Sequence, residues 1–160
     1  MANPRVYVET SVISYLTALP SRDLVVAAHQ QVTRDWWSSR TRFDLFVSDA
    51  VLQEVERGDG AAAARRLAAL DGIPVLSATL SAQALAKEFL RAAAMPSKAA
   101  IDAVHVAIAA THGVDFLITW NCAHIANAAV RGKIEAVCRD AGFRPPAICT
   151  PLELSGEEDE

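Results

Sequence analysis

The sequence predicts a three-layer α/β/α single domain with a central, mostly parallel sheet. Short apolar segments alternate along the chain with longer segments in which apolar residues recur every three or four positions. Alternating strands and helices favour parallel strand pairing, with helices on both faces of the sheet. The 160 residues suffice for one core, and no linker, low-complexity segment or repeat divides them. We therefore expect one domain over residues 1–154 and an acidic tail at 155–160.

The first expected strand is residues 5–8, because Arg-Val-Tyr-Val is a short, mainly apolar segment that ends at Glu9. A helix follows from Thr10, since its apolar residues are spaced for one face, and Pro20 ends it. A second helix is expected over 24–39, where a polar segment closes it.

The middle of the chain continues this pattern with alternating strands and helices. A strand is expected at 43–47, and Ser48 or Asp49 is placed to cap a helix that continues through Glu54 to Arg57. The further expected elements are an Ala/Arg helix at 61–70, a strand at 73–76 and an Ala-rich helix at 80–94.

The last third begins with the most apolar helix of the chain. Ser97 is expected to cap this helix over 99–112, and Gly113 ends it. The segment Asp-Phe-Leu-Ile-Thr at 115–119 is the clearest strand in the sequence. The remaining expected elements are a helix at 125–141 and a strand at 147–150.

Composition narrows the class of protein. The net charge of −4 argues against a general nucleic-acid coat protein, because such proteins hold phosphates through clustered Lys and Arg. It leaves open an enzyme that holds phosphate through metal ions. Three cysteines without a CxxC pair argue against a disulfide scaffold or a structural zinc site. No signal segment and no membrane-spanning stretch is evident, so we expect a cytoplasmic protein.

Three carboxylates stand out from this framework. Asp102 lies in the segment 99–110, where His105 is the only other polar side chain, so burial would penalise its charge unless a cation or several donors compensated. A surface position or a helix-start charge explains Asp102 equally well. Glu9 and Glu54 are each ordinary on their own, but three acids meeting at one strand end would repel each other unless Mg²⁺ or Mn²⁺ held them.

Four segments together resemble PIN domains, in the order in which that family has them. Residues 6–13 (VYVETSVI) resemble the opening strand and turn, where an acid and a small hydroxyl residue follow the strand. Residues 47–55 (VSDAVLQEV) resemble the second element, which carries a Glu. Residues 100–109 (AIDAVHVAIA) resemble the third, an Asp before small and apolar residues, and residues 115–121 (DFLITWN) resemble the fourth.

The resemblance implies a PIN-like fold and a metal-dependent endoribonuclease, most simply a VapC-like toxin of a type II toxin–antitoxin pair. It implies that Mg²⁺ or Mn²⁺ is held, directly or through water, by four side chains: Glu9, Glu54, Asp102 and Asn121. Two positions depart from the family, which usually has Asp where this chain has Glu9 and Asn121. Asn offers a carbonyl oxygen without a charge, so the site would carry three negative charges instead of four.

Further side chains near these acids are candidates for positioning water or phosphate: Thr10, Ser11, Lys98 and Thr119. The hydroxyls are equally expected to cap the first helix or to end a strand. Lys98 precedes Asp102 by one turn of the predicted helix and is expected to reach a substrate phosphate. Trp120 is expected to pack in the core in preference to stacking on a base, and His105 is expected to pack or hydrogen-bond inside the protein in preference to binding metal.

The resemblance also implies partners: an RNA substrate, a small antitoxin that inserts a basic side chain toward the acids, and a second copy of the chain in a homodimer. One alternative is a catalytically impaired PIN-like module that binds RNA or a partner protein, which the departures at Asn121 and Glu9 favour. A receiver-like or phosphatase-like domain is a weaker alternative, because the first strand ends in Glu9 instead of a nucleophilic Asp. A dinucleotide-binding role is disfavoured because no Gly-rich turn follows that strand.

Overall fold

A computed structural model describes residues 2–92 and 94–155, and of the tail predicted at 155–160 only Ser155 lies within them. The strands are β1 (Arg5–Val8), β2 (Asp44–Ser48), β3 (Val75–Leu76), β4 (Phe116–Ile118) and β5 (Ala147–Cys149). They form one sheet in the order β3–β2–β1–β4–β5, and every neighbouring pair is parallel. The predicted mostly parallel sheet is therefore parallel throughout.

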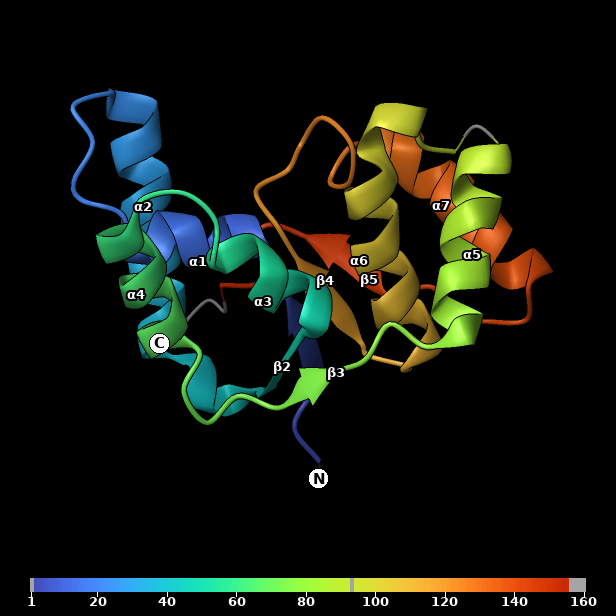
Figure 1. The fold of residues 1–160 in the computed structure, drawn as a ribbon, viewed down its shortest axis with the longest axis horizontal. Coiled ribbons are helices and arrows are strands. Elements are labelled where there is room, and N and C mark those ends of the chain that lie inside the picture. Colours follow the sequence, from blue (N-terminus) through green and yellow to red (C-terminus); the bar gives the residue numbers. More distant parts are fainter. Residues whose placement is uncertain (1, 93, 156–160) are drawn as a thin grey trace, which may run out of the picture.

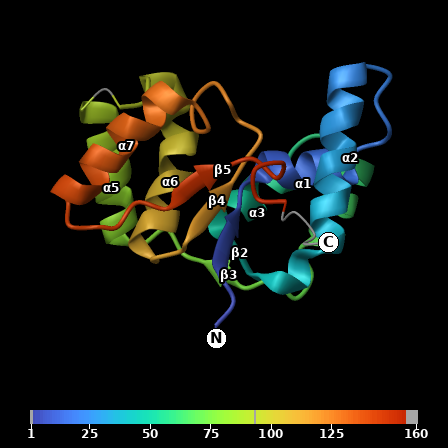
Figure 2. The same cartoon turned by 180° about the vertical axis from the view of Figure 1, so that it is seen from behind.

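The helices form two layers, one on each side of this sheet. They are α1 (Thr10–Thr17), α2 (Leu24–Ser38), α3 (Asp49–Val55), α4 (Gly60–Ala69), α5 (Leu80–Arg91), α6 (Ala100–Thr111) and α7 (Ala128–Asp140). In Figure 1, α1, α2 and α4 lie to the left of the sheet and α5, α6 and α7 to the right; the reverse view in Figure 2 shows the same division. The predicted three-layer α/β/α architecture is confirmed.

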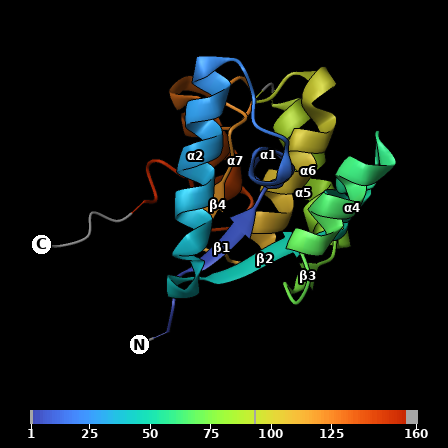
Figure 3. The same ribbon diagram turned by 90° about the vertical axis from the view of Figure 1, so that its left-hand side faces the viewer.

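The strand order has one switch point, where successive strands stop being added on one side of β1 and are added on the other. From β1 the chain adds β2 and β3 on one side, and it then crosses to add β4 and β5 on the other. Ligands of open α/β sheets bind beyond the carboxyl ends of the strands at such a point, which here lies between β1 and β4. Val8 pairs with Ile118, so Glu9 and Thr119 both follow the last paired residues. Figure 3 shows β1 leading from the N-terminal end directly into α1.

Helix caps explain most of the observed boundaries. Ser48 caps α3 as predicted, its hydroxyl accepting a hydrogen bond from the Val51 amide at 3.2 Å. Gly113, with φ of 67°, follows α6 in the left-handed conformation that glycine adopts without strain. The predicted helix at 125–141 starts only at Ala128, because the Asn127 side chain accepts from the Ala129 amide and caps it there.

The predicted cap at Ser97 is wrong. Residues Ser97–Ala99 form a short 3₁₀ turn, and α6 begins at Ala100 without a side-chain cap. This turn also breaks the helical spacing between Lys98 and Asp102 on which their predicted shared face depends. Lys98 is exposed, and no ion pair joins it to Asp102 within the described part of the chain.

The core lies against both faces of the sheet, and its largest fully buried side chains include Trp36, Tyr7, Phe89 and Ile13. From Ala103 onward α6 is mostly buried, as its apolar sequence predicts, whereas Ile101 in its first turn is 44% exposed. None of the helices in residues 2–92 and 94–155 has the length and apolar character that crossing a membrane requires.

Asp115 joins the start of β1 to the start of β4. Its carboxylate accepts from the Arg5 amide at 2.8 Å and from the Arg144 guanidinium at 2.9 Å. The hydrogen bond from the Arg5 amide, followed by the one from Arg144, lowers the pKa of Asp115 below its usual value of 3.8.

Asp115→Asn is expected to reduce the free energy of unfolding near neutral pH and to have less effect in acid. Because the folded-state pKa is lowered, the carboxylate stabilises the protein above its unfolded pKa, and this contribution is lost as pH falls through the folded pKa. Urea denaturation of both proteins between about pH 2 and pH 6 measures the difference. A difference that stays constant across this range would contradict the ionic contribution.

Candidate functional site

Glu9 lies at the carboxyl end of β1, and the residue is only 4% exposed. Its Oε2 accepts from the Ser11 amide and its Oε1 from the Ser11 hydroxyl, each at 2.7 Å. The Thr119 hydroxyl donates to the same Oε1 at 2.5 Å. Glu9 therefore caps α1 and ties its start to the end of β4, so both carboxylate oxygens already accept hydrogen bonds.

Glu54 reaches the same edge of the sheet from α3. Its Oε1 accepts from the Thr10 hydroxyl at 2.8 Å and forms a hydrogen bond with Nε2 of His105. Burial acts to raise the pKa of this half-buried carboxyl group, but the hydrogen bond and electrostatic interaction with His105, the hydrogen bond from Thr10 and the nearby charge of Arg57 together outweigh it, so the pKa is lowered. Glu54 is thus held as a carboxylate with Oε2 left free of these bonds.

Asp102 lies in the first turn of α6 with its side chain 22% exposed. Its Oδ2 is 3.0 Å from Nδ1 of His124, in the loop between β4 and α7. The expectation that protein covers this segment nearly all round is wrong for the first turn, where the helix emerges toward solvent. Asp102 therefore lies at the start of the helix with its carboxylate partly accessible to solvent.

Asn121 follows β4 and organises the loop that carries His124. Its backbone N–H donates to the Thr119 hydroxyl at 2.9 Å, and its side-chain Oδ1 accepts from the His124 backbone N–H at 3.1 Å. Oδ1 is the oxygen that was expected to face a metal ion. One of its lone pairs instead accepts the hydrogen bond that caps the turn. Asn121 connects Thr119 and Glu9 on one side with His124 and Asp102 on the other.

These contacts place the three predicted acids and the predicted amide in two hydrogen-bonded groups, which adjoin at Glu9 and Thr10 and together form the polar network at the carboxyl ends of β1 and β4. Thr10 and Glu9 are neighbours in sequence, and Thr10 bonds Glu54. Glu54 bonds His105, which is one helical turn from Asp102 on α6. The hydroxyls of Thr10, Ser11 and Thr119 donate to carboxylates, so they position the acids themselves.

The chemistry of these donors fits a hard divalent cation, which prefers oxygen ligands and carboxylates in particular. Oε2 of Glu54 and Oδ1 of Asp102 accept no hydrogen bond from any described residue, and both side chains are partly accessible. In residues 2–92 and 94–155, however, no three His, Cys, Asp or Glu side chains are gathered closely enough to hold an ion by themselves. Water-mediated contacts would then be part of any such site.

The sequence did not reveal the partners of His105. Tyr7 Oη lies 2.6 Å from His105 Nδ1 and 2.8 Å from Ser48 Oγ, and all three residues are buried. The signal was a single tyrosine in an otherwise aliphatic strand, which by itself names no partner. The expectation that His105 hydrogen-bonds inside the protein is confirmed.

Trp120 packs against protein as expected. Its ring stacks on His29 with centroids 4.2 Å apart, and its Nε1 donates to the Thr33 hydroxyl at 2.8 Å. One face of the indole is therefore covered, and the ring is fixed between the end of β4 and α2.

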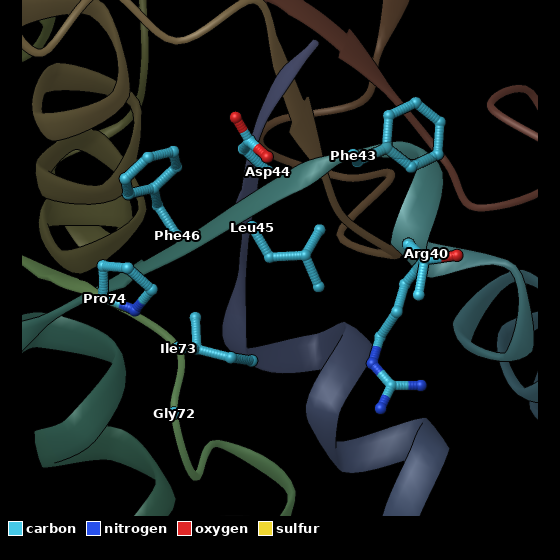
Figure 4. A pocket seen from close by; sticks show the side chains of 9 residues that line it. Arg40, Phe43, Asp44, Leu45, Phe46, Gly72, Ile73 and Pro74 are labelled. Carbon is cyan, nitrogen blue, oxygen red and sulfur yellow. The ribbon is translucent and has the colours of Figure 1, made fainter. Parts of the chain in front are cut away.

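A separate pocket of about 370 Å³ lies at the amino end of β2 (Figure 4). Leu45, Ile73 and Arg40 are among its lining side chains. β2 runs from Asp44 to Ser48, so this pocket and the cap of α3 lie at opposite ends of the strand. The pocket contains none of the predicted site residues and is not part of the polar network.

Comparison with known proteins gives an independent view of the whole chain. A model of the PIN domain family matches residues 6–129. Among solved structures, the chain is similar to Mycobacterium tuberculosis VapC20, described as a sarcin-ricin loop cleaving toxin. The TM-score is 0.58 at 20% sequence identity, covering 86% of this chain and 95% of VapC20, a likeness that concerns the fold alone. No curated protein sequence matches the chain.

Proposed function

Since the chain belongs to the PIN domain family, we propose that it is a Mg²⁺- or Mn²⁺-dependent endoribonuclease that hydrolyses RNA phosphodiester bonds. The observation that carries the proposal is the polar network, which brings Glu9, Glu54 and Asp102 to one edge of the sheet from three separate segments. Carboxylates that lie near one another repel, and a bound cation would relieve that repulsion.

Of the four candidate side chains, Glu54 and Asp102 have a carboxylate oxygen that accepts no hydrogen bond from a described residue, so they are the proposed direct ligands, with Glu9 and Asn121 acting directly or through water. A bound divalent cation would polarise a phosphate oxygen and lower the pKa of attacking water. The chain's own part is to hold the acids: Thr10 and His105 fix Glu54, and Thr119 fixes Glu9. Products would carry a 5′-phosphate and a 3′-hydroxyl.

We further propose that this nuclease acts in the cytoplasm as the toxin of a VapC-like toxin–antitoxin pair. The similarity in fold to VapC20 supports this role. A small antitoxin, encoded beside this chain, would insert a basic side chain toward the acids, for which the exposed parts of Glu54 and Asp102 supply complementary charge. A homodimer is part of the same proposal.

A second candidate is a catalytically impaired PIN-like module that binds RNA or a partner protein. It is favoured by Asn121, whose Oδ1 already caps a turn, and by the lack of a ready three-residue ligand cluster among the described residues. The two candidates differ in whether metal binding and strand cleavage occur at all.

The experiment that tests the proposal is incubation of the purified protein with structured RNAs, with Mg²⁺, Mn²⁺ or EDTA, alongside a calorimetric titration with Mn²⁺. Metal-dependent cleavage supports the nuclease. RNA binding without cleavage, together with no measurable Mn²⁺ binding, would replace it with the binding module.

Asn121→Asp is expected to tighten Mn²⁺ binding by about tenfold. The aspartate retains an oxygen that accepts from the His124 amide, so the turn survives, while a fourth negative charge is added to the candidate ligand set. Calorimetry on both proteins measures the change, roughly 1.4 kcal/mol if tenfold. Unchanged or weaker affinity would show that residue 121 does not face the ion.

A further inference from the structure

A row of buried polar side chains runs from the amino end of α3 to Glu54. Ser48 and Tyr7 are 0% exposed and His105 is 1% exposed. Tyr7 Oη is 2.8 Å from Ser48 Oγ and 2.6 Å from His105 Nδ1, and His105 Nε2 bonds Glu54 Oε1. Burial of three polar side chains destabilises a fold unless each is fully bonded, so the order of donors and acceptors matters.

Only one direction of hydrogen bonding satisfies every group in this row. The Glu54 carboxylate can only accept, so His105 donates from Nε2. In a neutral imidazole Nδ1 then accepts, and the Tyr7 hydroxyl is its donor. The Tyr7 oxygen accepts in turn from the Ser48 hydroxyl, whose own oxygen accepts from the Val51 amide at 3.2 Å. The reverse direction would leave the Ser48 proton without an acceptor among the described residues.

The charge state of Tyr7 agrees with this direction. Burial raises the pKa of Tyr7 far above its usual value, although the hydrogen bond with Ser48 acts to lower it. Tyr7 therefore keeps its proton and remains a donor.

We infer that Ser48, Tyr7 and His105 form a relay of hydrogen bonds that holds His105 in the Nε2–H tautomer and thereby fixes the rotamer of Glu54. His105 is a positioning residue, because it acts through Glu54 and is itself buried. The inference rests on the proposed function, in which Glu54 is a metal ligand.

The relay holds the Glu54 carboxylate in one orientation, which apolar packing around the side chain would not do. His105 and Thr10 both donate to Oε1, so one oxygen is fixed at two points and Oε2 is left as the free ligand oxygen. A carboxylate side chain held in this way loses less conformational entropy on binding an ion. Partners that orient metal ligands commonly contribute about 10- to 100-fold in metal affinity.

The first test is independent of any metal. Long-range ¹H–¹⁵N spectra of the full chain at neutral pH distinguish protonated from unprotonated ring nitrogens of its four histidines. His105→Gln identifies the His105 signals by their loss. The expected result is a proton on Nε2 and none on Nδ1. A proton on Nδ1, alone or on both nitrogens, would overturn the relay.

The second test measures Mn²⁺ affinity by calorimetry in matched variants. His105→Leu removes the donor and is expected to weaken binding by roughly 10- to 100-fold. His105→Gln places an amide N–H near the position of Nε2 and is expected to restore most of the affinity. Thr111→Val is the control, since its hydroxyl bonds only backbone carbonyls of its own helix.

Wild-type affinity in His105→Leu would overturn the positioning role, as would equal loss in His105→Leu and His105→Gln. If His105→Leu does not fold, Tyr7→Phe replaces it, because it removes only the hydroxyl that donates to Nδ1 and is expected to weaken Mn²⁺ binding and to mix the tautomers. If the wild-type protein binds no Mn²⁺, the proposed function fails, while the spectra still decide whether the relay exists.

Discussion

Asp102→Asn is expected to lower metal-dependent RNA cleavage by at least about 100-fold while leaving the fold intact. Loss of a group that merely orients a metal ligand already reduces activity about 10- to 100-fold, so loss of a charged ligand oxygen should do at least as much. The substitution preserves shape, and an amide oxygen can still accept from His124. The side chain is partly exposed at the start of α6, so little folding free energy depends on its charge.

Cleavage rates with Mn²⁺, and thermal unfolding of the same samples, check this result. Asp71→Asn is the matched control, since it removes the same charge from an exposed turn after α4. Retention of wild-type cleavage by the Asp102 variant would remove Asp102 from the site. An equal loss in the control would show that net charge, and not the site, governs RNA cleavage.

Glu9→Ala is expected to reduce the free energy of unfolding by roughly 2–4 kcal/mol. Loss of a helix cap costs about 1 kcal/mol, and each buried donor left without an acceptor costs roughly 1–3 kcal/mol more. The Glu9 carboxylate accepts from the Ser11 amide, the Ser11 hydroxyl and the Thr119 hydroxyl, so its removal affects both α1 and the end of β4.

Urea denaturation measures this loss, and Glu9→Gln provides a graded comparison. Glutamine keeps one acceptor oxygen for three donors and directs an NH₂ group at the rest, so an intermediate loss is expected. Glu56→Ala, at an exposed position after α3, controls for the removal of a glutamate. Full stability of Glu9→Ala would mean that the hydroxyls find other partners and that Glu9 is free to serve the metal alone.

The elements that could be predicted from sequence are those decided by local patterns. Apolar residues at strand or helix spacing predict β1 at residues 5–8 and α2 from Leu24, because burial of one face requires that spacing. The cap at Ser48 is equally local, since its hydroxyl bonds an amide three residues away. Ser97 has the same chemistry but lies in a 3₁₀ turn, which nothing in its neighbourhood indicated.

For the candidate site, the sequence indicated which residues belong to it but not how their side chains are hydrogen-bonded. Glu9 directly follows β1 and Asp102 interrupts an apolar helical pattern, whereas Glu54 and Asn121 were named through the resemblance of their segments to PIN domains. Whether their oxygens are free could not be known. Donors to Glu9 and Asn121 already hydrogen-bond their oxygens, whereas the donors to Glu54 both use Oε1 and leave Oε2 free. The packing of α1, α3, α6 and the loop after β4 brings these donors into place.

The sequence by itself determined the α/β/α class and most element positions, because these follow from hydrophobic spacing and chain order, and the resemblance to PIN domains named the candidate site residues. Only the tertiary structure decided which groups bond one another. Thr10 bonds Glu54 across 44 positions, Tyr7 bonds His105 across 98, and Thr119 bonds Glu9 across 110. A hydrogen bond depends on distances of a few tenths of an ångström, and only the packed sheet and helices set such distances between segments so far apart.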